Sequence, residues 1–268
     1  EEGRDLVRRL LAVPGPGTGI LVTNAVGQQW LGYEELRAVR PDLILVHILG
    51  RSDGRPAVDY TVNSEVGLPW LTGPADLNRP VNHVLPAWDL IAGTHAALAV
   101  LAAERVRRER GTGQLVELYL SDVAVAAMAH LGFVADVVVN GRRRLREGNY
   151  LYGSYGCDFA TRDGRRVMVV ALTSRHWRNL VALAGIGDAI TALERTLGVE
   201  FTDEEVRYEY RDMVSALLAP WFRARTHTEV ITALDKSQVL WGDYRTVEEL
   251  VTAPDALLAT SGLFHDVH

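Results

Sequence analysis

The stretch Pro80-Val-Asn-His-Val-Leu-Pro-Ala-Trp-Asp89 runs directly into Leu90-Ile-Ala-Gly-Thr-His-Ala-Ala-Leu-Ala99 and places a carboxylate between a loop and a helix of small residues. Its alanines and apolar spacing predict a long, closely packed helix over 90–108. Gly111-Thr-Gly113 ends this helix, because glycine often follows a helix C-terminus. Asp is a favoured N-cap residue, so Asp89 is predicted to cap the helix, a role compatible with chemistry.

Strand patterns surround this helix. The continuous apolar runs at 20–23 and 43–49 predict buried strands, and the alternating run at 114–120 predicts a strand with one exposed face or an edge position. Because these strands alternate with helices, residues 1–145 are predicted to form a Rossmann-like α/β domain with a parallel sheet. Residues 121–139 are predicted to form one buried helix, not a membrane span, capped by Ser121 or Asp122.

The pattern changes after Asn140, where a basic linker leads to a smaller α+β domain predicted over 150–255. Asp163-Gly164 between two apolar runs predicts a β-hairpin. Ser174 is predicted to cap a helix, and further helices are predicted over 203–218, over 228–236 and from 247 onward. Residues 256–268 are predicted to return toward the large domain.

Composition limits the function classes. The chain has 268 residues, a formal net charge of -6 and 48% hydrophobic residues, so a packed protein without a nucleic-acid footprint is expected. The single cysteine, Cys157, excludes an internal disulfide and fits a reducing, cytoplasmic compartment. The histidines show no paired metal-ligand spacing, so no metal site is predicted.

Several segments together resemble family III CoA-transferases. Asp89 and its loop, the Gly-rich loop 49–59, the Tyr/Gly segment 150–156 and the hairpin at 158–172 match that family over most of the chain. The resemblance implies an interlocked homodimer and an acyl-CoA substrate, with coenzyme A as part of the substrate and no permanently bound cofactor. It also implies that Asp89 is the nucleophile toward the thioester. The helix N-terminus is expected to lower the pKa of Asp89 and to offer N–H donors to the oxyanion.

Within the family, the segments around Asp89, 149–153 and 158–161 most resemble members that move CoA between the C1 and C4 carboxyls of mesaconate. An intermolecular transferase with a separate acid acceptor, or a non-catalytic acyl-CoA binding protein, are the alternatives. A racemase is disfavoured, because racemisation needs two opposed bases and Val58 stands where the racemases of this fold have histidine.

The chain departs from the family pattern in two places. Asn24-Ala-Val-Gly27 replaces the usual Asn-Phe-Arg-Pro-Gly. The N-terminal nucleotide-binding half of the family is expected to be missing here, so much of the CoA adenine site is not assigned.

Five further residues are candidates for binding substrate or CoA. Arg51 and Arg55 can bind phosphates or a carboxylate, since guanidinium groups pair with both, although a solvated loop explains them as well. Asp59 is placed near the thioester by the resemblance, with a turn-ordering role as the alternative. Tyr152 and Gly153 belong to a segment that acts either as a lid over Asp89 or as a domain linker.

Histidines and arginine-rich stretches are the remaining polar candidates. His83 and His95 are candidate proton shuttles, with a packed, hydrogen-bonded role as the favoured alternative for His95, and His47 is expected to be structural. The arginine-rich stretches 105–110 and 142–144 are expected to be a solvated helix end and a solvated linker, because cations at a helix C-terminus are favourable without a ligand.

Overall fold

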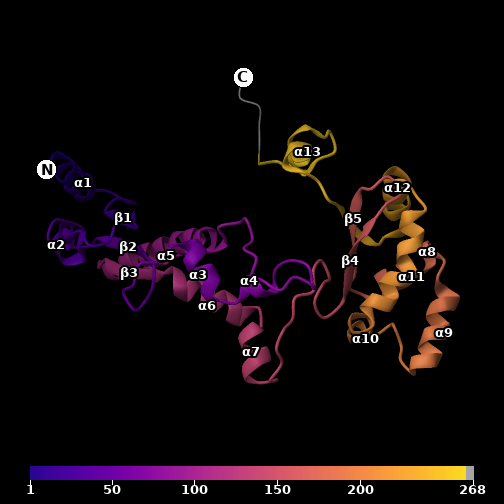
Figure 1. Cartoon of the computed structure of the whole chain (residues 1–268). Helices are drawn as coiled ribbons and strands as arrows, with labels where there is room; N and C mark the ends of the chain where they lie inside the picture. The colour runs from indigo at the N-terminus through magenta and orange to yellow at the C-terminus, as the bar shows by residue number, and fades with distance from the viewer. Residues whose placement is uncertain (264–268) are drawn as a thin grey trace. The chain divides into compact units, whose positions relative to one another are not determined.

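The computed structural model describes residues 1–263, which divide into a first unit ending at Arg146 and a second unit beginning at Glu147 (Figure 1). Each unit has its own sheet and its own hydrophobic core. Within 1–263, none of the helices combines the length and apolar character that crossing a lipid bilayer requires.

The first unit is built on a three-stranded parallel sheet. Its strands are β1 (Ile20–Thr23), β2 (Ile44–Leu49) and β3 (Gln114–Tyr119), in the order β1-β2-β3. The register pairs Ile44 of β2 with Ile20 of β1 and with Gln114 of β3. The predicted parallel sheet is confirmed, and so is the edge position of the strand with alternating exposure.

Both faces of the central strand are covered. Leu43 and Leu45 pack toward α1 (Glu2–Ala12), η1 (Gln29–Leu31) and α2 (Tyr33–Arg37). Ile44 and Val46 form a separate cluster with alanines of α5 (Ala87–Arg110). Ala96 and Ala103 are 4% and 0% exposed, and their small side chains let α5 lie close against the sheet. The apolar run of β2 is therefore buried on both sides, as expected for a central parallel strand.

A second cluster fixes the start of α5. It joins α3 (Asp59–Glu65), the first turns of α5 and α6 (Leu120–His130), with the short helix α4 (Leu68–Leu71) nearby. Trp88 is its largest member and is 2% exposed. Because Trp88 directly precedes Asp89, packing of this indole determines where the first turn of α5 lies.

The C-terminal end of α5 is attached to the sheet by Arg107. Its guanidinium Nη1 donates to the carbonyl oxygens of Thr18 at 2.8 Å, Asp42 at 3.2 Å and Gly19 at 3.3 Å, and it forms a close ion pair with Glu104. The side chain is 7% exposed. The expectation of a solvated helix end is wrong for Arg107, because the loop carbonyls lie within reach of this face of the helix.

The predicted buried helix over 121–139 is also wrong. Two helices, α6 and α7 (Phe133–Val138), are separated by Gly132 with φ of 80°. Val137 and Val138 are 59% and 76% exposed, and α7 buries none of its residues. The first residue of α6 follows Tyr119 without a side-chain cap, so the predicted cap at Ser121 or Asp122 is wrong as well.

The second unit contains an antiparallel sheet. Strands β4 (Tyr155–Ala160), β5 (Arg166–Ala171) and β6 (Leu240–Asp243) lie in that order, and the register Ala160↔Arg166 confirms the hairpin around Asp163-Gly164. Its core includes Phe159 and Phe222, whose rings stack at 4.3 Å between centroids. The helices of this unit are α8 (Ser174–Ala184), α9 (Gly187–Leu197), α10 (Glu204–Glu209), α11 (Arg211–Arg223), α12 (His227–Ser237), α13 (Val247–Thr252) and α14 (Leu257–Thr260).

Several boundaries in the second unit differ from the predicted ones. The cap of α8 is Thr173, whose side chain accepts from the backbone N–H of His176, rather than Ser174. The single helix predicted over 203–218 is divided at Tyr210, and α9 was not predicted. The predicted return segment 256–268 contains α14, and its residues 264–268 lie outside the described residues.

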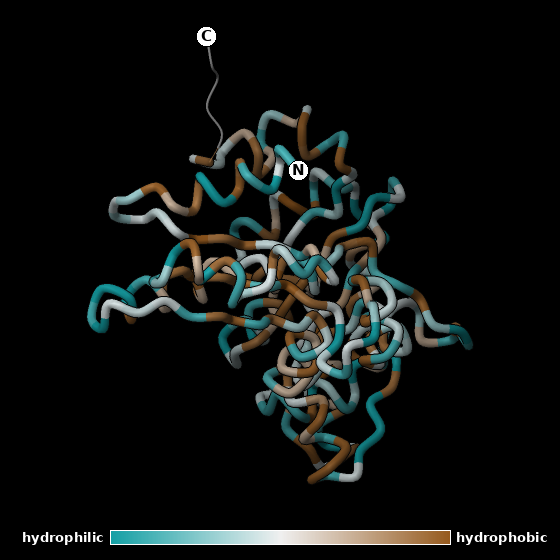
Figure 2. The backbone as a smooth tube through the Cα atoms, turned by 90° about the vertical axis from the view of Figure 1, so that its left-hand side faces the viewer, coloured by the Kyte–Doolittle hydropathy of each residue, from teal (hydrophilic) through white to brown (hydrophobic). Residues whose placement is uncertain are grey.

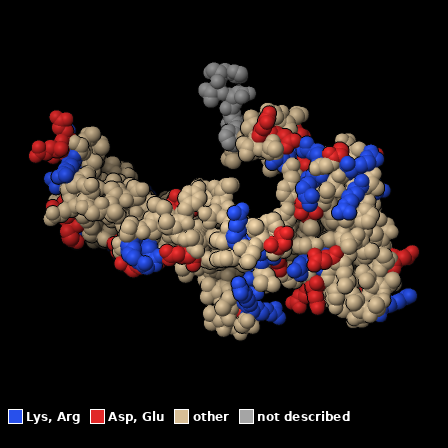
Figure 3. Space-filling model, viewed as in Figure 1, with Lys and Arg blue, Asp and Glu red and all other residues tan. Residues whose placement is uncertain are grey.

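Hydropathy and charge vary over short distances in the chain. Hydrophobic and hydrophilic segments alternate along the backbone, and several projecting loops are hydrophilic (Figure 2). Acidic and basic side chains are interspersed on the face shown in Figure 3, in keeping with the many local ion pairs. The net charge of -6 is therefore not gathered into one acidic patch on that face.

Removing Arg107 is expected to destabilise the first unit. Arg107→Ala leaves Oε2 of Glu104 without its ion pair and three carbonyl groups without their donor. We expect the free energy of unfolding to fall by about 3 kcal/mol as a result. Arg105→Ala is the matched control, because Arg105 lies on the same helix with 82% of its side chain exposed. Urea unfolding of both variants measures the difference, and equal stabilities would contradict the anchoring role.

Candidate active site

Asp89 is the third residue of α5 and not its N-cap. The cap position belongs to Pro86, which has no capping side chain, so the predicted capping role of Asp89 is wrong. Asp89 is exposed, and its carboxylate makes no hydrogen bond or ion pair with any of residues 1–263. A carboxylate in this state keeps its oxygen lone pairs available for a substrate carbon.

The cap of α5 comes from a different helix. Asp59, the first residue of α3, accepts with one oxygen from the backbone N–H of Trp88 at 2.8 Å and of Asp89 at 3.1 Å. Asp59 is only 2% exposed and is the first residue of α3, so the alternative of a loop residue that orders the turn before Tyr60 is wrong. Asp59 contacts the backbone of Asp89 directly, whereas its predicted place near the thioester stays a prediction.

This arrangement reverses the expected electrostatics. The pKa of Asp89 is raised above its ordinary value, first by partial desolvation and second by the negative charge of Asp59. The expected lowering by the helix N-terminus is wrong, because the N–H groups of Trp88 and Asp89 already donate to Asp59. For the same reason these two donors are not free to bind an oxyanion.

A series of side-chain hydrogen bonds holds the indole of Trp88, the residue before Asp89. Trp88 Nε1 donates to Asn63 Oδ1 at 3.3 Å, and Asn63 Nδ2 donates to Asn82 Oδ1 at 3.3 Å. His83 packs edge-on against Trp88, with 6.5 Å between ring centroids. Asn63 is 1% exposed, yet nothing in the sequence singled it out, because its partners lie 19 and 25 residues away.

Arg51 and Arg55 both form ion pairs with Asp53, an acidic residue of their own loop. Asp53 forms ion pairs with Arg51 at 3.2 Å and with Arg55 at 2.7 Å, and Arg51 also contacts Glu65 at the end of α3. The Arg55 guanidinium, followed by the other contacts of the loop, holds the pKa of Asp53 well below its usual range. A phosphate or carboxylate at either arginine would have to compete with these acids, and their binding role stays a prediction.

Tyr152 and Gly153 belong to the second unit. The ring of Tyr152 lies edge-on to Tyr208 at 5.2 Å, and Gly153 has φ of 75° with open space around it. Tyr208 and Arg211 both contact Glu147, which holds the base of the segment. The last two residues of the segment 150–156 are part of β4, and one of them, Tyr155, is fully buried. A movable segment is therefore limited to 150–154. Its role as a lid stays a prediction.

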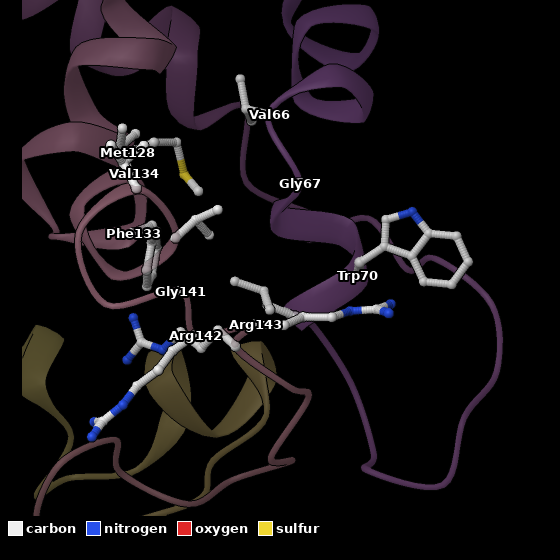
Figure 4. Close-up of a pocket in the computed structure, with 13 residues that line it drawn as sticks. Val66, Gly67, Trp70, Met128, Phe133, Val134, Gly141, Arg142 and Arg143 are labelled. Atoms are coloured by element: carbon white, nitrogen blue, oxygen red, sulfur yellow. The ribbon is translucent and has the colours of Figure 1, made fainter.

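An apolar groove of about 720 Å³ lies elsewhere on the first unit (Figure 4). Phe133 and Val134 of α7 line one side, Trp70 of α4 lies on the other, and Arg142 and Arg143 lie along its edge. Asp89 and Asp59 are not among its lining residues, so this groove is separate from the candidate active site.

His47 and His95 each contact a backbone carbonyl group. His47 Nε2 hydrogen-bonds to the carbonyl of Ala25 at 2.9 Å, consistent with a structural role. His95 Nδ1 is 2.9 Å from the carbonyl of Ile91, but its side chain is exposed rather than packed. Within residues 1–263 no three His, Cys, Asp or Glu side chains gather in a way that would hold a metal ion.

The first unit is a parallel α/β unit with an exposed aspartate near a helix start, and the second is an antiparallel α+β unit. Residues 1–268 match the family model described as CoA-transferase family III, and the chain belongs to this family. The predicted family fold is thereby confirmed. A crystal structure of a CAIB/BAIF family protein from Brucella suis superimposes with a TM-score of 0.73 at 25% identity, covering 95% of this chain and 66% of that one.

Curated relatives give a more specific likeness. The chain is 48% identical over 249 residues to 2-methylfumaryl-CoA isomerase of Chloroflexus aurantiacus, covering 93% of this chain and 61% of the relative. It is 26% identical over 264 residues to succinyl-CoA–D-citramalate CoA-transferase of the same organism, with 94% and 62% covered. The chain therefore spans about three fifths of the length of these relatives.

Proposed function

We propose that this protein takes part in intramolecular CoA transfer between the C1 and C4 carboxyls of mesaconate. The 48% identity to an enzyme named 2-methylfumaryl-CoA isomerase supports this substrate class more than the 26% identity to a named intermolecular transferase supports the alternative. The exposed and unpaired carboxylate of Asp89 supports the chemistry. Acyl-CoA is then the substrate, coenzyme A enters only as part of it, and no permanently bound cofactor is required.

The proposed first step is attack by Asp89 on the thioester. A carboxylate oxygen forms a bond to the acyl carbon, the C–S bond breaks, and its electron pair leaves as CoA thiolate. The product is a mixed anhydride, which conserves the free energy of the thioester. No proton is transferred, so the step needs an ionised Asp89 and no general base.

The second step returns the thiolate to the anhydride. Attack on the aspartyl carbonyl gives an enzyme–CoA thioester and frees the dicarboxylate, whose other carboxylate then attacks this thioester. The resulting anhydride is opened by CoA thiolate at the substrate carbonyl, which gives the other regioisomer and restores Asp89. Water must be excluded throughout, because it would hydrolyse either intermediate.

We further propose that the protein is a homodimer. Leu90, Leu98 and Leu101 of α5 are 56%, 62% and 68% exposed, so the helix that carries Asp89 presents an uncovered apolar stripe. A second copy over this stripe would also shield the nucleophile from water. A cytoplasmic location is part of the proposal, because it keeps the free thiol of Cys157 reduced.

Asp89→Asn is expected to remove activity without lowering stability. The amide cannot form the anhydride, so turnover should fall by about a thousandfold or more. A raised carboxylate pKa means that the folded state holds its proton more tightly than the unfolded chain, so ionisation of Asp89 costs stability as pH rises through the folded pKa. At pH 7 the variant should therefore unfold at the same or a higher urea concentration. Wild-type turnover in purified, undeamidated variant would disprove the nucleophile assignment.

Intramolecular transfer predicts that free acid is neither needed nor incorporated. The full-length protein is incubated with one mesaconyl-CoA regioisomer and isotope-labelled free mesaconate, and both regioisomers are separated and analysed for label. We expect complete interconversion with the label left in the free acid. Rapid incorporation, or a strict need for added acid, would favour an intermolecular transferase, and absence of any conversion would favour a binding protein.

The apolar stripe on α5 predicts the oligomeric state. Light scattering of the full-length protein is expected to give the mass of two chains, and the double change Leu98→Asp and Leu101→Asp is expected to shift it toward one. Val22→Asp is the control, because Val22 is 46% exposed and belongs to β1, not to α5. A single-chain mass for the unaltered protein would contradict the dimer.

A further inference from the structure

The first turn of α5 has all of its N–H groups occupied. Ala87 N–H donates to the carbonyl of Leu85 at 2.8 Å and Leu90 N–H to that of Pro86 at 3.1 Å. The two N–H groups between them, of Trp88 and Asp89, both donate to Asp59. The carboxylate of Asp89 therefore has no unoccupied N–H at its own helix start, where an Asp side chain usually binds.

Capping alone does not require a charge at this position. Asn and Ser cap helices about as well as Asp, whereas a buried carboxylate without a counter-ion has a large desolvation cost. Asp59 is 2% exposed, its second oxygen has no hydrogen-bond partner within residues 1–263, and no cation of that range forms an ion pair with it. A neutral cap would be the less costly choice if the only task were to start α5.

The charge acts on Asp89. Among the ionisable groups on the elements around the helix start, which include Tyr60, Glu65, His83, His95 and Asp122, only Asp59 contributes to the pKa of Asp89 beyond desolvation. Repulsion between the two carboxylates exists before attack on the thioester. It is relieved as the electron pair moves to the sulfur of CoA, so the repulsion raises the ground state more than the transition state.

We propose that Asp59 is a positioning residue for acyl transfer, which occupies the first-turn N–H donors of α5 and keeps the Asp89 carboxylate unpaired and strongly nucleophilic. This proposal rests on the proposed function, because it needs Asp89 to be the attacking group. Asp59 itself makes no contact with substrate. Because it occupies two backbone N–H groups in order to activate the nucleophile, these two groups cannot donate to an oxyanion.

Asp59→Asn removes the negative charge of residue 59 but keeps an oxygen that can cap α5. The amide oxygen can still accept from Trp88 and Asp89, so the unfolding midpoint should stay within the range of surface variants. We expect the turnover number to fall about tenfold with a nearly unchanged KM. The acid limb of the pH profile and the carbon-13 NMR titration of the Asp89 carboxyl should both move to lower pH, because the repelling charge is gone.

Two further variants control this experiment. Asp122→Asn removes one charge at the start of α6 and is expected to change neither the NMR titration nor the turnover number. Asp59→Ala removes both cap and charge and should lower stability as well as activity. An Asp59→Asn protein with wild-type turnover and an unmoved Asp89 titration would overturn the proposal and leave Asp59 as a cap.

The NMR titration keeps the two hypotheses apart. It is measured on the free protein and needs no turnover, and Asp89→Asn assigns the resonance. If no CoA ester is converted by the unaltered protein, the proposed function fails while the Asp59–Asp89 coupling remains measurable. If esters are converted and the resonance does not move in Asp59→Asn, only the positioning role fails.

Discussion

The bond from Asp59 to the backbone of α5 is the constraint on which the candidate site depends. Its two short contacts, at 2.8 and 3.1 Å, tie the first residue of α3 to the second and third residues of α5 across about thirty positions of sequence. They set where the helix begins, and they leave the Asp89 carboxylate without an N–H partner at the helix N-terminus. An Asp at a helix start usually has a lowered pKa, whereas this one has a raised pKa.

The opposite end of α5 is fixed by the same kind of contact. Arg107 donates to carbonyls of two loops that border β1 and β2, as Asp59 accepts from the N-terminal N–H groups. Between these ends, Ala96 and Ala103 pack on β2. A helix held at both ends and along one face is a rigid carrier, which is what a nucleophile needs if its oxygen is to meet a carbonyl carbon at a defined distance.

Asp89, the proposed nucleophile, differs from the neighbouring charged residues in its exposure and in its lack of a partner. Arg51, Arg55 and Asp53 neutralise one another in their own loop, and their exposed ion pairs contribute little to stability. Asp89 has no hydrogen-bonded or ionic partner for its carboxylate within residues 1–263, and it lies next to a carboxylate that repels it. Such an unfavourable arrangement adds nothing to folding, which is why it supports a catalytic role.

The sequence by itself determined the parallel strands and the hairpin at Asp163-Gly164, because apolar periodicity and turn residues depend on near neighbours. It also singled out Asp89 as the candidate nucleophile, which stays a prediction. Only the tertiary structure decided that Asp59, and not Asp89, caps α5, that Arg107 is buried, and that α7 is exposed. These outcomes depend on groups brought together from distant positions, and a local pattern contains no distance between them. The direction of the pKa shift of Asp89 was mispredicted for the same physical reason: the donors that would have lowered it were already bound by a residue thirty positions away.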